Sequence, residues 1–215
     1  MYNNIIKPLK EKVMKKFLTL LCALCIALGC MAFVACSNSG GSTEVTAQEY
    51  ASALEFNGDL KLVMQVIDGS EETTTTFVRD DNKIEMKNVQ AAEVSHIYLN
   101  KANAEYFIYA QVNGQWNKQS SNEGQYNYYN GFPLIATRAY NDLAFELFTY
   151  DTNENCYVYT QTAEGMSGTF KMYFNDKKVV KIQTTVVHHT DGATITTKID
   201  FTYGEKVTLP LGEGN

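Results

Sequence analysis

The sequence "VVKIQTTVVHHTDGATITTKIDFTY", residues 179–203, predicts an antiparallel β-hairpin. Apolar and polar side chains alternate along both of its halves, a pattern typical of strands with one buried face. The Asp-Gly pair at 191–192 separates the halves and predicts a two-residue turn, which would place Ile182 opposite Phe201. The apolar face of the hairpin would then carry Val180, Ile182, Thr184, Val186, His188, Ile195, Thr197, Ile199, Phe201 and Tyr203.

The same alternation recurs along the chain and predicts a β-meander. Clusters of Gly, Asn and Asp separate the apolar segments at hairpin spacing. Two stretches have helical features: residues 45–56, where Thr46 and Glu49 have capping-box spacing, and residues 133–148, which start with a proline. We therefore predict an α+β fold that is mainly antiparallel β, a curved meander sheet or half-barrel of about ten strands wrapped on one or two helices. The predicted strands are 60–67, 73–79, 83–89, 95–100, 105–112, 115–120, 156–162, 168–174, 179–189 and 194–203.

The hairpin that turns at residues 113–114 differs from the others because both of its faces are partly apolar. Tyr106, Ile108, Ala110 and Val112 point to one side, whereas Phe107, Tyr109 and Trp116 point to the other. We expect such a section to be covered twice, by helices on one face and by core, ligand or partner on the other. The candidate residues for a ligand cavity or core face are Phe107, Tyr109, Trp116, Ile182, Phe201 and Tyr203.

The N-terminal region has the features of an export signal. Lys12, Lys15 and Lys16 precede an apolar run over residues 17–35. Met14 is an alternative start, because "MKKFLTLL" opens in the way that signal peptides do. The run also has the length of an uncleaved membrane helix, which needs about 20 apolar residues.

The end of the apolar run resembles the lipobox of bacterial lipoproteins. "FVAC" ends at Cys36 and is followed by the small polar residues "SNSGGS". "ALGC", which ends at Cys30, is the alternative attachment site, but cleavage there would leave the apolar stub "MAFVA" ahead of the tether. We therefore expect a signal peptide over residues 1–35, a diacylglycerol anchor on Cys36, a flexible tether over 36–44 and one domain over 45–215.

Charge and cysteine content exclude several classes of partner and scaffold. Residues 36–215 contain 13 Lys and Arg against 23 Asp and Glu, a formal charge of −10, whereas the whole chain of 215 residues has −6. This negative charge disfavours nucleic acid and anionic lipid head groups. Cys156 is the only cysteine within residues 45–215, so a disulfide framework is excluded there.

Three motifs that could support chemistry do not have the required spacing. His188 and His189 are adjacent, so in a strand they point to opposite faces and cannot ligate one ion together. The segment from Asp151 begins like an EF-hand loop but has Cys156 where a glycine is needed. "EGMSG" at 164–168 lacks the Gly-x-Ser-x-Gly spacing of a nucleophile elbow. We therefore predict no catalytic residue, no metal site and no cofactor.

Taken with the leader, four further segments resemble a known group of proteins. They are "VTAQEY" at the start of the first helix, "GQWNK" after a tyrosine-rich strand, "FNDKKVVKI" and the final "FTYGEKVTLP". The chain is similar to small uncharacterised lipoproteins of Gram-positive gut bacteria, which look like relatives of the LolA/LppX-type half-barrel. That resemblance implies a curved sheet wrapped around helices and a concave apolar cavity, which in characterised members carries lipid or lipoprotein acyl chains.

These observations lead to two expectations of function. The first is a non-enzymatic, monomeric protein, lipid-anchored on the extracytoplasmic face of the bacterial cell membrane, that binds or carries a lipid or other apolar ligand in a concave cavity. The alternative is a surface interaction or structural protein whose core is filled by its own helices, with no small-molecule ligand. Thirteen of the 14 tyrosines lie in residues 36–215, which suits both a β-sheet and a wet binding surface.

Overall fold

The computed structural model describes residues 45–91 and 93–211. All described residues belong to one compact unit of the chain. The expected signal peptide, Cys30, Cys36 and the whole of the tether lie outside the described residues. Within the described ranges, no helix is both long enough and apolar enough to span a membrane.

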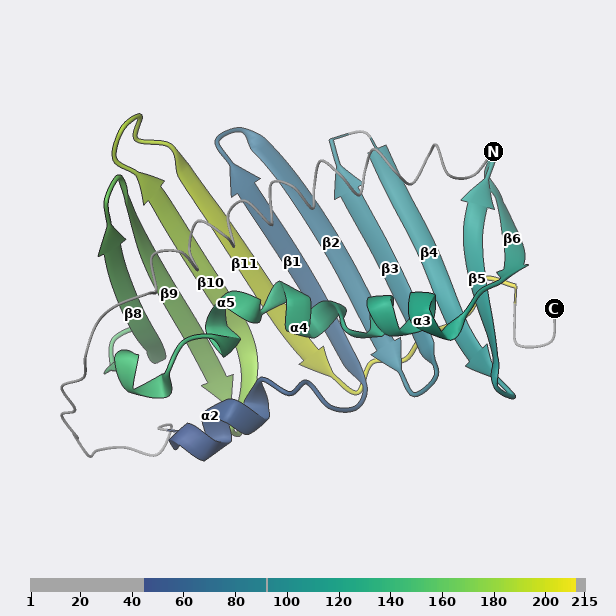
Figure 1. Ribbon diagram of the computed structural model, residues 1–215, viewed down its shortest axis with the longest axis horizontal. Helices are drawn as coiled ribbons and strands as arrows, with labels where there is room; N and C mark the ends of the chain where they lie inside the picture. Colours follow the sequence, from purple (N-terminus) through teal and green to yellow (C-terminus); the bar gives the residue numbers. More distant parts are fainter. Residues whose placement is uncertain (1–44, 92, 212–215) are drawn as a thin grey trace. The chain divides into compact units, whose positions relative to one another are not determined.

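The described residues form one antiparallel sheet of eleven strands, which confirms the predicted α+β meander (Figure 1). The sheet is curved and open, with β6 at one edge and β7 at the other; the order across it is β6-β5-β4-β3-β2-β1-β11-β10-β9-β8-β7. The strands are β1 (Leu60–Asp68), β2 (Glu71–Asp80), β3 (Lys83–Gln90), β4 (Glu93–Ala102), β5 (Glu105–Val112), β6 (Gln115–Ser120), β7 (Thr149–Asp151), β8 (Cys156–Ala163), β9 (Met166–Asn175), β10 (Lys178–His188) and β11 (Thr194–Tyr203).

The pairing of β1 with β11 joins the two halves of the meander. All other neighbouring strands are consecutive in the chain, whereas β1 and β11 are the first and the last strands. Leu62 of β1 lies opposite Phe201 on one side and Phe77 on the other, and all three side chains are buried. The first and the last strands therefore pair with each other in the middle of the sheet, where these side chains are buried.

The register predicted for the β10–β11 hairpin is wrong by two residues. Ile182 lies opposite Ile199 and not opposite Phe201, because the loop comprises four residues, 189–192, closed by the hydrogen bond from the His188 N–H to the Ala193 carbonyl. A shift by an even number of residues leaves every side chain on its predicted face. Ile182, Ile199 and Phe201 are accordingly buried together on one face of the sheet.

A β-bulge in β10 shows that the predicted facing of Val180 is wrong. The pairing of β10 with β9 shifts between Val179 and Lys181, so Val180 is the extra residue. A bulge reverses the alternation of side chains on one side of it. As a result Val179 is fully buried, whereas the prediction had placed Val180 on the apolar face.

Five short helices belong to the described residues: α2 (Ala47–Ala53), α3 (Glu123–Asn130), α4 (Phe132–Ala136), α5 (Arg138–Asn141) and the 3₁₀ helix η1 (Phe145–Leu147). The capping box predicted at Thr46 and Glu49 is confirmed at the start of α2. The single helix predicted over 133–148 is wrong. Helix α3 starts earlier, at an Asn122 N-cap, and the chain then turns twice, at Gly131 and at Thr137.

The series of helices α3, α4, α5 and η1, here called the helical layer, crosses one face of the sheet (Figure 1). We call this the inner face. Phe132 of α4 packs on Phe77, with ring centroids 5.6 Å apart, and Tyr126 of α3 packs on Tyr106 at 5.6 Å. The largest fully buried side chains lie in the sheet and are Tyr109, Phe77, Phe170, Leu60, Leu62, Ile84, Leu99, Met172, Ile182, Ile199, Val179 and Val186.

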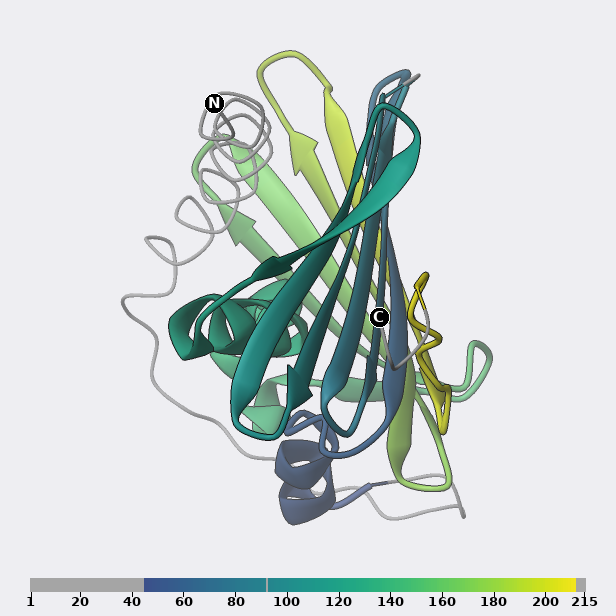
Figure 2. The same ribbon diagram turned by 90° about the vertical axis from the view of Figure 1, so that its right-hand side faces the viewer.

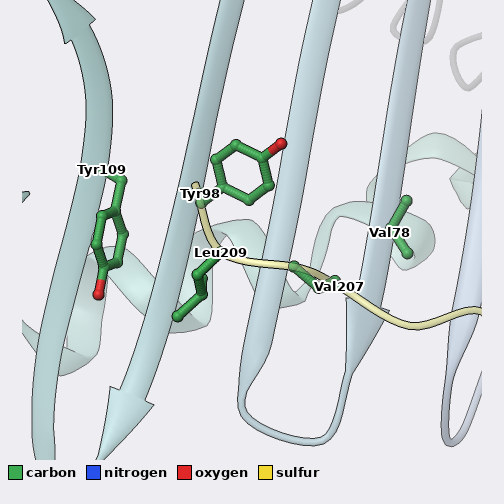
Figure 3. Close-up of a cluster of buried hydrophobic side chains, with 5 residues drawn as sticks. All are labelled: Val78, Tyr98, Tyr109, Val207 and Leu209. Carbon is green, nitrogen blue, oxygen red and sulfur yellow. The ribbon is translucent and has the colours of Figure 1, made fainter. Parts of the chain in front are cut away.

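Residues 205–211, here called the C-terminal strap, cover part of the opposite, outer face (Figure 2). Val207 and Leu209 of the strap are buried in a cluster with Val78, Tyr98 and Tyr109 of the sheet (Figure 3). The hairpin β5–β6 is therefore covered on both faces, as its two apolar patterns predicted. The cover on the outer face is the chain's own C-terminal segment.

Candidate functional site

The six candidate residues lie on opposite faces of the sheet and line no single cavity. On the inner face, Phe201 stacks on Phe56 with centroids 4.9 Å apart, and Ile182 is only 1% exposed. The Tyr203 hydroxyl donates a hydrogen bond to the Val179 carbonyl at 2.8 Å. Phe201 and Ile182 are parts of the packed core of the sheet, and Tyr203 is half-buried.

The other three candidates belong to the outer face. Tyr109 is fully buried under the strap, and Phe107 and Trp116 pack against the same cluster. Next to them, the Tyr98 hydroxyl donates a hydrogen bond to a Glu85 carboxylate oxygen at 3.2 Å. The outer face in this region is thus a small second core that is closed by residues 205–211.

Beside this second core, His96 lies 2.8 Å from the Glu85 carboxylate, measured from its Nε2. The His96 ring also contacts Trp116 and Tyr98, with centroid distances of 5.2 and 4.8 Å. Tyr98 and Trp116 meet edge to face at 5.2 Å. The three rings touch one another, so they leave no space between them for a ligand and act as packing.

On the inner face, buried tyrosines fasten the helical layer to the sheet. Tyr140 of α5 is 2% exposed, and its hydroxyl donates a hydrogen bond to the Gln183 carbonyl at 2.6 Å and lies 2.9 Å from the Thr184 hydroxyl. The Tyr50 hydroxyl of α2 donates to the Tyr140 carbonyl at 2.9 Å. Burial raises the pKa of both tyrosines, so both stay neutral and can donate. The space between α5 and the sheet is therefore filled by the chain itself.

An open groove lies on the flank of the helical layer, between α2 on one side and α4 to η1 on the other. Its volume is about 440 Å³, within the range of about 300–1,000 Å³ that small-molecule sites have. The groove is lined by Ala47, Tyr50, Ala51, Leu54, Glu55, Leu134, Asn141, Leu143, Phe145 and Glu146.

Several side chains that line the groove are apolar and pack against one another. Tyr50, Leu54 and Leu143 are buried at 4–5% exposure, and the Phe145 ring lies 5.1 Å from the Tyr50 ring. Leu134 of α4 is different, because 48% of it is exposed although it lines the groove. A leucine left half exposed beside buried apolar side chains is a surface on which an apolar ligand gains burial.

Glu55 and Glu146 are the charged residues of the groove lining, which contains no lysine or arginine. Two cations, Lys177 of the β9–β10 turn and Arg138 of α5, have anionic partners. Lys177 pairs with Glu49 of α2, and the hydrogen bond from Lys177 lowers the pKa of that carboxyl. The Arg138 guanidinium of α5 lies 3.7 Å from an Asp142 carboxylate oxygen. The lining of the groove therefore contains two acidic side chains and no basic one.

The other sequence motifs take structural roles. Cys156 is 1% exposed, and burial raises the pKa of its thiol, which disfavours the reactive thiolate. In the segment from Asp151, which begins like an EF-hand loop, a carboxylate oxygen of Asp151 accepts hydrogen bonds from the N–H groups of Asn153 and Glu154. This is an Asx-type turn between β7 and β8. Among the described residues, no group of three or more metal-ligating side chains could hold a metal ion.

The groove could not be predicted from the sequence, because it is formed by short helices where one continuous helix over 133–148 was expected. A continuous helix over 133–148 would place Leu134 and Leu143 on opposite faces, because the nine positions that separate them turn the helix by about 900°. The break at Thr137, whose hydroxyl donates to the Pro133 carbonyl at 2.9 Å, redirects the chain, and both leucines line the groove. A missed signal was the alternation of Val207, Leu209 and Leu211, which is typical of an extended segment with one apolar face.

Comparisons with known proteins add little to this geometry. No family model matches the chain, and no curated protein does so. Among solved structures, the chain is similar to the S-type phycobiliprotein lyase of Guillardia theta, with 7% sequence identity and a TM-score of 0.34. The similarity covers 77% of this chain and 96% of that chain. Because both values are low, we draw no functional conclusion from it.

Proposed function

We propose that this protein is a lipid-anchored, extracytoplasmic, non-enzymatic binding protein, and that it takes an apolar or amphipathic ligand in the groove between α2 and η1. The observation that supports it is the groove itself, which is open, has a volume of about 440 Å³ and is lined mostly by apolar side chains. The ligand site differs from the one expected from sequence. It lies beside the helical layer and not between that layer and the sheet, where Tyr140 and its neighbours already pack.

The expected anchor would bring this groove to the membrane. Cys36, the proposed attachment site, precedes Val45 by nine residues, and α2 begins two residues later. A flexible tether of that length spans about 16–18 Å on average and about 30 Å at full extension. Two acyl chains on one cysteine give a stable attachment, since each buried methylene contributes about 0.8 kcal/mol. With that anchor, the groove would lie near the membrane, where lipids are the most abundant amphiphiles.

Native mass spectrometry of residues 37–215, which include all described residues, tests the binding function. We expect added mass that is removed by solvent extraction and identified as lipid. Leu134→Gln should abolish this adduct, because it places an amide on the exposed apolar wall of the groove. Leu147→Gln is the matched control, since Leu147 is a similarly exposed leucine, 42% against 48%, outside the groove lining.

Two results would contradict the binding function. A bare polypeptide mass after incubation with phospholipid vesicles would remove its basis. An adduct that survives Leu134→Gln unchanged would place the ligand elsewhere.

Incorporation of labelled fatty acid in a bacterial host tests the anchor separately. We expect Cys36→Ser to lose the label and Cys30→Ser to keep it. The reverse pattern would assign the anchor to Cys30, and unlabelled wild-type protein would contradict lipid attachment.

The second candidate is a surface interaction protein without a small-molecule ligand. The packing of the inner face favours it, because the helical layer buries Tyr140 and Phe170 against each other at a centroid distance of 5.6 Å. A core filled by the chain itself needs no ligand for stability. A bare mass in the experiment above would make this the leading function.

A further inference from the structure

We infer that the groove selects amphiphiles with a cationic head group, an apolar chain that carries an amine or a quaternary ammonium. This inference specifies the ligand class of the proposed function and rests on it. It is carried by the combination of an apolar wall, Leu54 and Leu134, with two acidic residues, Glu55 and Glu146, in one groove.

The carboxylates come from both sides of the groove. Glu55 follows α2 directly after its C-cap residue, Leu54, and Glu146 lies in η1. Both side chains are exposed, and both line the groove together with its apolar side chains. A ligand whose chain lies on Leu134 would therefore hold its head group within reach of two negative charges.

The surroundings reinforce this sign instead of cancelling it. Helix α2 ends beside Glu55, and its last turn contains no basic residue, so the carbonyl end of the helix adds negative potential. Within residues 45–91 and 93–211, no ion pair is found for Glu55 or Glu146, and Glu55 accepts only a neutral donor, the Asn57 amide, at 3.0 Å. The nearby cations, Lys177 and Arg138, are paired with carboxylates of their own.

The size of the expected selectivity follows from Coulomb's law. One carboxylate about 6 Å from an ammonium in water changes the dissociation constant by about threefold, and two change it by about tenfold. The same charges repel an anionic head group by the same factor. At low ionic strength we therefore expect the cationic amphiphile to bind about 100-fold more tightly than the anionic one. This preference should fade at about 1 M salt, where the screening length is about 3 Å.

Isothermal titration calorimetry on residues 37–215 tests the inference with three probes of equal chain length: decyltrimethylammonium, decyl sulfate and decyl maltoside, each below its micellar concentration. The variants are Glu55→Gln, Glu146→Gln and the double variant, with Glu164→Gln as a control that removes an exposed charge at the β8–β9 turn. We expect each groove variant to weaken cation binding by about threefold and the double variant by about tenfold. Binding of decyl maltoside should stay unchanged.

The outcomes separate this inference from the function on which it rests. If all three probes bind equally and Leu134→Gln weakens them all, the groove binds amphiphiles and the charge selectivity is refuted. If the cation is preferred but the double variant keeps that preference, the carboxylates are not its cause and the inference is equally refuted. If no probe binds, or if Leu134→Gln has no effect, the proposed function itself fails.

Discussion

Truncation of Leu209 in the C-terminal strap should destabilise the domain by about 2 kcal/mol. Leu209 is 6% exposed and packs with Val207 against Tyr98 and Tyr109 on the outer face. Leu→Ala in a protein core costs about 2–5 kcal/mol, and the cost is smallest where the surroundings can collapse into the cavity. A strap only seven residues long, with solvent on its other side, can settle towards the sheet, so we expect the low end of that range.

Equilibrium unfolding in urea measures this change. With a slope of about 2 kcal/mol per molar, a loss of about 2 kcal/mol lowers the urea midpoint by about 1 M. Trp116 is the only tryptophan of the chain and packs against the same cluster. Its fluorescence therefore reports on the strap directly, and we expect Leu209→Ala to shift the emission of the folded protein to longer wavelength.

The control is Thr208→Ala, an exposed position on the same strap, which should stay within about 0.5 kcal/mol of the wild type. A Leu209→Ala midpoint equal to that of Thr208→Ala would refute the reasoning. It would mean that the outer face of β4 and β5 is stable without its cover.

Three other predictions concern buried polar groups. Stability should fall as the pH rises from about 10 to about 12, because burial raises the pKa of Tyr98 and Tyr203 to about 12 while unfolded tyrosines ionise near 10. Urea midpoints across that range measure the fall, and Tyr98→Phe should reduce it. A constant midpoint would contradict this prediction. The Cys156 thiol should react with a disulfide reagent at least about 100-fold more slowly in the folded domain than in urea, and equal rates would show that it is accessible. Tyr140→Phe should cost about 1–2 kcal/mol by losing its buried hydrogen bonds, and a urea midpoint equal to that of the wild type would argue against those bonds.

Strand content and side-chain facing were predictable because alternation is a property of single segments. The hairpin of β10 and β11 shows the limit of that reasoning. The Asp-Gly pair at 191–192 was a correct turn signal, but it did not reveal that residues 189 and 190 also belong to the loop. An error of two residues moves pairs along the strand without exchanging the faces, so Ile182 and Phe201 were assigned correctly to the buried side.

The helical layer was not predictable in the same way. Residues 123–147 form four short helices, and none of them is long enough to show a full apolar stripe. Tyr126 and Tyr129 are buried side chains of α3, yet "GQYNYYNGF" is polar and aromatic with no helical period. The burial of these tyrosines comes from contacts with the sheet, such as that of Tyr126 with Tyr106, which link residues distant in sequence.

The two covers of the sheet limit where a ligand can bind. Binding between the helical layer and the sheet would require breaking the hydrogen bond from Tyr140 to the Gln183 carbonyl and separating the rings of Tyr140 and Phe170. A ligand at that place would therefore bind more tightly to Tyr140→Phe, in which part of this cost has been removed beforehand. A ligand in the groove between α2 and η1 meets side chains that are already exposed, such as Leu134, so its affinity should not respond to Tyr140→Phe. The response of affinity to this one hydroxyl thus distinguishes a half-barrel that opens from one that binds on its flank.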